Sequence, residues 1–177
     1  NVQYIVVIFL GFWLSNSQGQ EAPGAKQRGS VLLLNGTAHL GTGEMINRSA
    51  IVLENGKIVK VMNALTNTIN NADYDTVIDI KDKHVYPGFI AVNSTLGLME
   101  IGAVRATEDF KEIGTYNPNV RSIIAYNTDS KITPTIRTNG VLLAQVTPRG
   151  GIVSGSSSVV HFDAWNWEDA LIKEDIG

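Results

Sequence analysis

The sequence offers three polar side chains for pocket chemistry: Asn93, Thr95 and Arg149. Asn93 and Thr95 follow the short apolar run 89–92, which comes after a Pro-Gly pair and is typical of a strand buried on both faces of a parallel sheet. Active sites of α/β proteins lie at the carboxyl ends of such strands. Asn93 and Thr95 therefore either line a substrate pocket or hydrogen-bond their own loop.

Arg149 stands at the start of the segment 150–158, which is rich in Gly and Ser. Backbone N–H groups of Gly-rich loops can cradle phosphate, and an arginine beside them can pair with an anion. The segment matches neither the P-loop pattern nor the dinucleotide-binding fingerprint. The alternative is a flexible loop that returns to a strand over 159–162.

The first half of the chain predicts a small β-structure that precedes these residues. Short β-rich segments separated by turns are typical of a sheet or sandwich. Asn35-Gly36 predicts a turn, and Asn55-Gly56 between two β-rich runs predicts a hairpin. The expected strands are 31–34, 49–53, 57–61 and 75–80.

The second half predicts a different organisation, in which strands alternate with helical segments. One helix is expected to begin at 117–119, and a second to begin at 129–130 and stop before Gly140, with Pro134 in its first turn. A second buried strand is expected over 140–147. The order strand, helical segment, strand is that of a βαβ unit in a parallel sheet.

The stretch from His84 to Leu98, which reads His-Val-Tyr-Pro-Gly-Phe-Ile-Ala-Val-Asn-Ser-Thr-Leu-Gly-Leu, resembles the amidohydrolase superfamily, most closely its imidazolonepropionase-like branch. In that family a small β-sandwich leads into a Pro-Gly-Phe-Ile segment, the first strand of a (β/α)8 TIM-like barrel. The resemblance covers roughly residues 31–170. It implies an α/β fold with a partial β-sandwich over 31–86 and an incomplete start of the barrel over 87–177.

The resemblance also locates a metal motif, because the family's first barrel strand ends in Asp-X-His-X-His and its histidines bind the metal. Here those three positions are Ala91, Asn93 and Thr95. Neutral amide and hydroxyl oxygens are poor ligands for zinc-like metals compared with imidazole. We therefore expect no metal site at this strand and no cofactor within this chain, while a divalent metal such as zinc could be held by later strands of a full-length protein.

The same resemblance places the loop that contains Arg149 on the active face, so that Arg149 joins Asn93 and Thr95 as a candidate pocket-lining residue. The catalytic residues cannot be named from this sequence. The histidines His39, His84 and His161 are scattered. We expect His39 and His84 to have packing or surface roles and not to bind metal.

Two functions of different classes remain open. The family implies a hydrolase that acts on carbon–nitrogen bonds other than peptide bonds in a small-molecule substrate, with metal dependence. The residues Asn93 and Thr95 favour instead a metal-free binding or scaffold protein that keeps the fold. No feature predicts the oligomeric state.

The N-terminus predicts export. Residues 4–14 are apolar or aromatic throughout and are followed by small and polar residues. As a helix this run would reach only about 16 Å at ~1.5 Å per residue, too short for a hydrocarbon core of about 30 Å. We predict a signal peptide over 1–19, a polar tether over 20–30, and a periplasmic or extracellular location.

Composition excludes several classes of partner. The chain is 44% hydrophobic and 18% charged with a net charge of −3, which suits a folded domain but offers no basic surplus for nucleic acid or for an anionic membrane once the leader is removed. It contains no cysteine, which excludes disulfides and thiolate metal sites.

Overall fold

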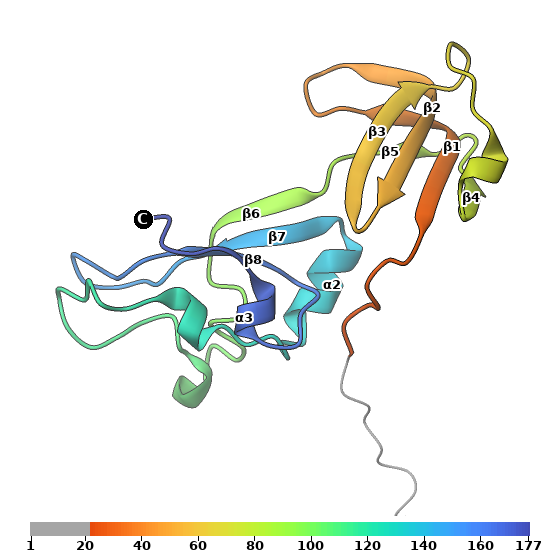
Figure 1. Cartoon of the computed structure of the whole chain (residues 1–177). Coiled ribbons are helices and arrows are strands. Elements are labelled where there is room, and N and C mark those ends of the chain that lie inside the picture. Colours follow the sequence, from red (N-terminus) through yellow and green to blue (C-terminus); the bar gives the residue numbers. More distant parts are fainter. Residues whose placement is uncertain (1–21) are drawn as a thin grey trace, which may run out of the picture.

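The computed structural model describes residues 22–177, which form two mixed β-sheets with a few short helices (Figure 1). The chain is therefore α/β, with strands predominating. The predicted signal peptide over 1–19 lies outside the described residues. Within 22–177 no helix has both the length and the apolar character needed to cross a membrane.

The first sheet has the strand order β3-β2-β1-β4, and β5 also pairs with β1. Neighbouring strands run antiparallel in β1–β2 and β2–β3 but parallel in β1–β4 and β1–β5. The strands are β1 Ser30–His39, β2 Met45–Glu54, β3 Lys57–Asn63, β4 Thr76–Asp79 and β5 His84–Val85. The hairpin predicted at Asn55-Gly56 is confirmed, since these residues connect β2 to β3.

The turn predicted at Asn35-Gly36 is wrong, because β1 continues through both residues to His39. Register shifts on either side of Gly36 mark an irregularity in the β1–β2 pairing, and Asn35 has a φ of 71°. Asparagine and glycine suit a bulge for the same reason that they suit a turn, since both tolerate positive φ. The Gly36 carbonyl accepts a buried hydrogen bond from Ser49 Oγ at 2.9 Å, which holds the bulge in the sheet.

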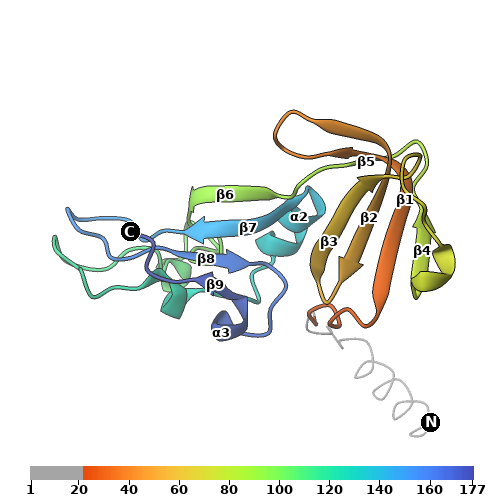
Figure 2. The same ribbon diagram turned by 45° about the horizontal axis from the view of Figure 1, so that its top comes forward.

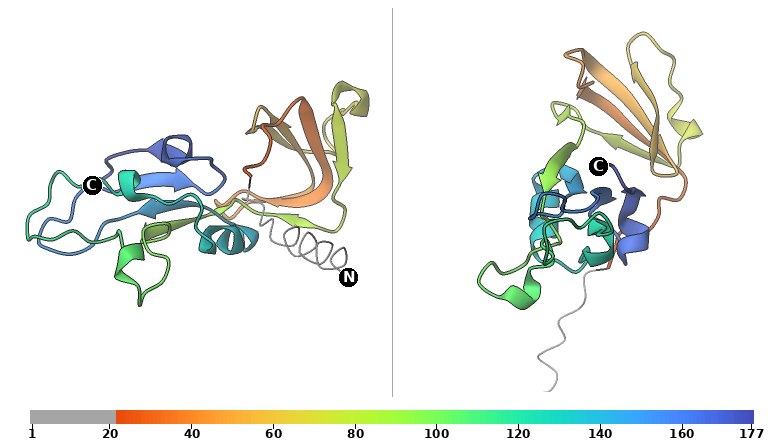
Figure 3. Two further views of the ribbon diagram at one scale, coloured as in Figure 1. Left: turned by 90° about the horizontal axis from the view of Figure 1, so that it is seen from below. Right: turned by 90° about the vertical axis from the view of Figure 1, so that its left-hand side faces the viewer.

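The second sheet has the order β6-β7-β8-β9, and only its β6–β7 pair is parallel. Its strands are β6 Phe89–Ser94, β7 Val141–Val146, β8 Ser158–His161 and β9 Leu171–Lys173. The strand predicted over 140–147 is confirmed as β7, and so is its parallel pairing with the strand that begins at Phe89. Its predicted burial is only partial, since Leu142 is exposed. The two sheets lie side by side and are joined by residues 86–88 (Figures 2 and 3).

The prediction that residues 89–92 are buried on both faces is wrong. Phe89 is 66%, Ile90 55% and Val92 71% exposed. Within residues 22–177, β6 pairs only with β7 and forms an edge of the sheet. An apolar run is buried on both faces only when strands or helices cover it on all sides, and the described residues supply one neighbouring strand.

The helices of the second half are short. They are the 3₁₀ helices η2 Arg105–Thr107 and η3 Ser122–Ala125 and the α-helices α2 Ile132–Thr138 and α3 Trp167–Ala170; the 3₁₀ helix η1 Asn71–Asp73 lies in the first half. The helix expected to begin at 129–130 and to stop before Gly140 is confirmed as α2. The helix expected to begin at 117–119 is reduced to η3, because Asn117 N donates to Val153 O at 2.8 Å and this segment pairs with another loop.

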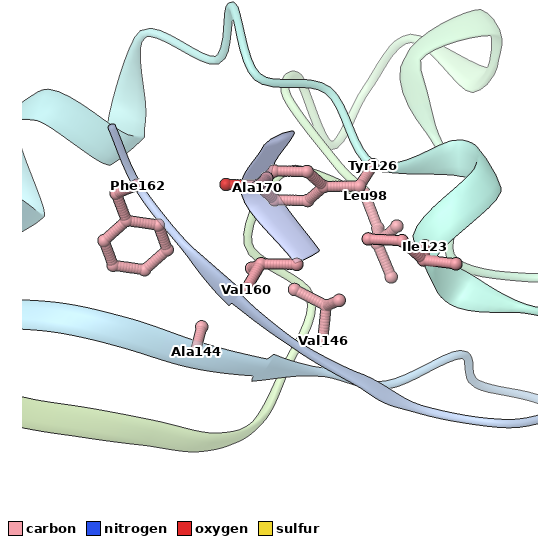
Figure 4. Close-up of a cluster of buried hydrophobic side chains, with 8 residues drawn as sticks. All are labelled: Leu98, Ile123, Tyr126, Ala144, Val146, Val160, Phe162 and Ala170. Atoms are coloured by element: carbon pink, nitrogen blue, oxygen red, sulfur yellow. The ribbon is translucent and has the colours of Figure 1, made fainter. Parts of the chain in front are cut away.

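The main core lies between the second sheet and the helices that cover one of its faces (Figure 4). Its buried members are Leu98, Ile123, Tyr126, Ala144, Val146, Val160, Phe162 and Ala170. Burial raises the pKa of the Tyr126 hydroxyl to about 12, and the nearby Glu100 carboxylate adds to this shift. A smaller cluster of Leu32, Ala50 and Val52 supports the first sheet.

Residues 22–29, most of the predicted tether, connect the two parts of the chain. Gln27 Nε2 donates to Leu53 O at 2.8 Å in the first sheet, and Gly24 N donates to both carboxylate oxygens of Asp163 at 3.2 Å. Arg137 also forms an ion pair with Asp163. Partial burial alone would raise the pKa of Asp163, but these hydrogen bonds and the guanidinium outweigh it and hold the pKa below its ordinary value of 3.8.

The lowered pKa of Asp163 makes the stability of the chain pH-dependent. The stabilisation is fully present above pH 3.8 and is lost as the pH falls through the lower pKa of the folded state. We expect Asp163→Asn to remove this loss and to leave a smaller dependence of the urea midpoint on pH between about pH 5 and about pH 2. Equal pH dependence of the midpoint in both proteins would contradict the role of Asp163.

Candidate functional site

The candidate site lies at the carboxyl ends of β6 and β7. Asn93 has a φ of 52°, and the β6–β7 register shifts between Ala91 and Ser94. Asparagine adopts positive φ more readily than most residues, which allows an irregularity at this point. The strands remain paired beyond it, because Thr147 N donates to Ser94 O at 2.8 Å.

The structure brings together two of the three residues predicted to line the pocket. Arg149 Nη2 donates to the backbone carbonyl of Asn93 at 2.7 Å, although the two residues are 56 positions apart. The backbone N–H of Arg149 donates to Phe110 O at 2.7 Å, which fixes the start of the loop. The ion pairs among residues 22–177 do not include Arg149. Its guanidinium is exposed at the strand end, with donors that can meet an anion.

Thr95 is placed differently. Its carbonyl accepts a hydrogen bond from Leu98 N at 2.9 Å and closes a turn directly after β6. Within the part of the chain that the structure describes, no hydrogen bond joins Thr95 to Asn93 or Arg149. This bond is made by the backbone of Thr95, so the role predicted for the Thr95 side chain stays a prediction.

Gln145 is a member of this site that sequence reasoning missed. Its Oε1 accepts a hydrogen bond of 3.4 Å from Asn93 N, and its Nε2 donates to Ser157 Oγ at 2.9 Å. Ser157 is fully buried. A signal was present in the sequence, because Gln145 interrupts an otherwise apolar strand, and a polar residue in such a strand needs hydrogen-bond partners.

Two loops run together from this end of the sheet. Residues 99–121 pair with residues 148–157 through isolated bridges at Lys111–Arg149, Tyr116–Val153 and Arg121–Ser156. The backbone N–H groups of Ile152 and Ser156 donate to carbonyls of the facing loop at 2.7 and 2.8 Å. These N–H groups are therefore used in holding the Gly-rich segment against the facing loop, and are not free to bind a phosphate.

An open hollow of about 340 Å³ lies along the first of these loops. Asp109, Glu112, Arg121 and Pro148 are among its lining residues, which include none of the three predicted pocket residues. Arg121 is bound there to the carboxylates of Glu174 and Asp175. The hollow is therefore a separate feature from the Asn93–Arg149 contact.

The residues at this strand end do not fit a zinc ion. Within residues 22–177, no group of three or more His, Cys, Asp or Glu side chains is placed to hold a metal. The Asn93 and Thr95 side chains offer neutral oxygens, and the Arg149 guanidinium, itself a cation, binds the Asn93 carbonyl. A tight zinc site needs three or four convergent protein ligands, drawn from cysteine, histidine and carboxylate side chains.

We expect the chain to retain less than stoichiometric zinc after dialysis. In a longer protein whose later strands supply further ligands, we expect the double change Asn93→His with Thr95→His to raise zinc retention. Elemental analysis of both forms measures this. The matched control is Asn117→His with Asn119→His in the loop 99–121. Stoichiometric zinc in the unmodified chain would overturn the assignment of Asn93 and Thr95 to the ligand positions.

Comparison with known proteins gives a structural match only. No protein-family model and no curated protein matches the sequence. The crystal structure of an amidohydrolase from Thermotoga maritima MSB8 is similar over 83% of this chain, with a TM-score of 0.73 and 25% identity. A prolidase complexed with n-methylphosphonate-l-proline is a weaker match, at 19% identity, a TM-score of 0.44 and 65% coverage of this chain.

The chain spans 37% of the length of the Thermotoga maritima amidohydrolase. The likeness extends over both sheets of the described structure, since it covers most of the chain, and it agrees with the resemblance noted around Pro87-Gly88. The fold of this chain is therefore similar to that of an amidohydrolase over most of the chain's length.

Proposed function

We propose that the chain is part of a hydrolase of the amidohydrolase fold that acts on carbon–nitrogen bonds other than peptide bonds in a small-molecule substrate. The observation that carries the proposal is the match to the Thermotoga maritima amidohydrolase over 83% of the chain. The proposed activity belongs to a protein of the neighbour's length, since the chain spans 37% of that length. Within the superfamily we propose the imidazolonepropionase-like branch.

In this proposal residues 31–86 are part of a β-sandwich and residues 87–177 are the start of a TIM-like barrel. Asn93 and Arg149 line the pocket from the first two parallel strands. The free N–H donors of Arg149 orient a carbonyl or carboxylate oxygen of the substrate. Because Asn93 and Thr95 do not fit a metal, a divalent ion such as zinc is held by residues outside this chain.

We also propose that the protein is exported, on the evidence of the apolar run 4–14 and the small residues that follow it. The mature chain is expected to begin near Gln20 in the periplasm or outside the cell. N-terminal sequencing of secreted material measures this directly. A soluble folded product that keeps residues 4–14 would contradict the signal-peptide assignment.

A second candidate function is a metal-free binding or scaffold protein that retains the fold. The contact between Arg149 and Asn93 favours it, because a guanidinium lies where the family places metal ligands. Such a site would bind an anionic small molecule and leave it unchanged.

Turnover separates the two candidates. The protein, purified from its natural source, is assayed against a panel of amides, ureas and lactams, with peptides and phosphate esters as controls. The first candidate is supported if a carbon–nitrogen bond is hydrolysed, and if the rate of hydrolysis falls in Arg149→Gln but not in Arg105→Gln. Saturable binding of an anionic member of the panel without turnover, lost in Arg149→Gln only, supports the second. Neither turnover nor binding would contradict both.

A further inference from the structure

Two histidines that are 45 positions apart meet at the end of the first sheet that leads into β6. His39 is the last residue of β1, and His84 is the first residue of β5. His39 Nε2 and His84 Nδ1 lie 2.9 Å apart, so that one ring donates a hydrogen bond to the other. Neither this contact nor a metal role was expected for the two histidines, because the contact depends on the pairing of β5 with β1.

Strand pairing holds the two imidazoles in place. β1 and β5 pair in parallel with Thr37 opposite His84, and Thr37 N donates to Lys83 O at 2.9 Å. Tyr86 stacks on the His39 ring, with centroids 4.1 Å apart and an angle of 15° between the planes. The His39 and His84 rings are tilted by 37°, with centroids 5.2 Å apart. Both nitrogens are therefore positioned before any ligand arrives.

The separation of these nitrogens suits neighbouring positions around one metal ion. Two nitrogens about 2.05 Å from an ion, at a right angle to each other, lie about 2.9 Å apart. Because His84 is exposed and His39 only half-buried, an ion and its water ligands can approach from solvent. Each ring must rotate so that its lone pair turns from the line that joins the two nitrogens toward the ion. The ring hydrogen that joined the nitrogens then moves to the other nitrogen of its ring, so that both imidazoles stay neutral.

We propose that His39 and His84 form a two-imidazole site for Cu(II), with water in the remaining positions. Cu(II) favours square-planar or tetragonal coordination by nitrogen and oxygen, and it binds such donors more tightly than the other divalent ions of its row. Zinc sites in proteins use three or four protein donors, whereas this pair supplies two. The site lies in the first sheet and is independent of the Asn93–Arg149 site and of the proposed hydrolase.

Titration with Cu(II) at neutral pH tests the proposal. The readouts are the stoichiometry and the nitrogen hyperfine structure of the electron paramagnetic resonance spectrum. We expect one strong site per chain with two imidazole nitrogens. His39→Gln and His84→Gln should each weaken its affinity by about tenfold or more, because one imidazole remains. Circular dichroism of each variant establishes that the fold is retained.

The matched control is His161→Gln, since His161 is the other histidine of the sequence and its Nε2 is bonded to Asp169 O at 2.8 Å. This change should leave the affinity and the spectrum unaltered. Unchanged Cu(II) affinity in folded His39→Gln and His84→Gln would overturn the proposal. A spectrum with a single nitrogen ligand in the unmodified chain would overturn it as well.

Discussion

The 177-residue chain is expected to self-associate at micromolar concentration, because the open edge of its second sheet is apolar. Ile90 and Val92 are exposed on β6, and β6 pairs only with β7 among the described strands. An unpaired strand edge carries free N–H and C=O groups that template pairing with another chain. Exposed apolar side chains along that edge add a hydrophobic driving force.

Light scattering after size exclusion measures the association. The double change Ile90→Lys with Val92→Lys should shift the chain to a monomer, since charged residues on an edge strand oppose edge-to-edge pairing. Ile113→Lys is the matched control, because Ile113 is 86% exposed but lies in the loop 99–121 and not on a strand. A monodisperse monomer with a cooperative melt in the unmodified chain would contradict the prediction. An equal effect of Ile113→Lys would show that the edge is not responsible.

Local patterns in the sequence predicted the elements whose signals are local. The Asn55-Gly56 hairpin, the α2 helix with Pro134 in its first turn, and β7 all have the predicted type and place. In each case the determining residues lie within a few positions of one another. The prediction of a turn at Asn35-Gly36 was wrong because the deciding contact is not local. The same two residues suit a bulge, and the pairing of β1 with β2 decides between turn and bulge.

Contacts between distant segments set the limits of prediction at the candidate site. Asn93 and Arg149 were each identified from their types and positions, but the hydrogen bond between them depends on the pairing of β6 with β7. Gln145 was missed although it stands in an apolar strand. The His39–His84 contact required the alignment of β1 with β5, which two short segments 45 positions apart do not reveal.

Replacing Gly97 by alanine is expected to cause the largest loss of stability among the single changes considered. Gly97 is buried directly after the strand end that contains Asn93 and Thr95, and its φ is 72°. A Cβ atom there would lie inside van der Waals contact with the Tyr126 ring and 3.2 Å from Asn127 O. Left-handed backbone costs alanine about 1–2 kcal/mol, and overpacking costs about 1–3 kcal/mol, so the expected loss is about 2–5 kcal/mol.

Gly56→Ala is a matched control for this change. Gly56 also has a φ of 72°, but a Cβ there would meet nothing within 4 Å. Gly56→Ala should therefore lower the free energy of unfolding only by the cost of the left-handed backbone, about 1–2 kcal/mol. Urea unfolding in the Ile90→Lys, Val92→Lys background measures both changes in a monomer. Because the clash is with the Tyr126 ring, Gly97→Ala should cost less in a Tyr126→Leu protein. Equal losses for Gly97→Ala and Gly56→Ala would show that Tyr126 does not pack tightly on Gly97, and that the turn behind Asn93 and Thr95 is held by other contacts.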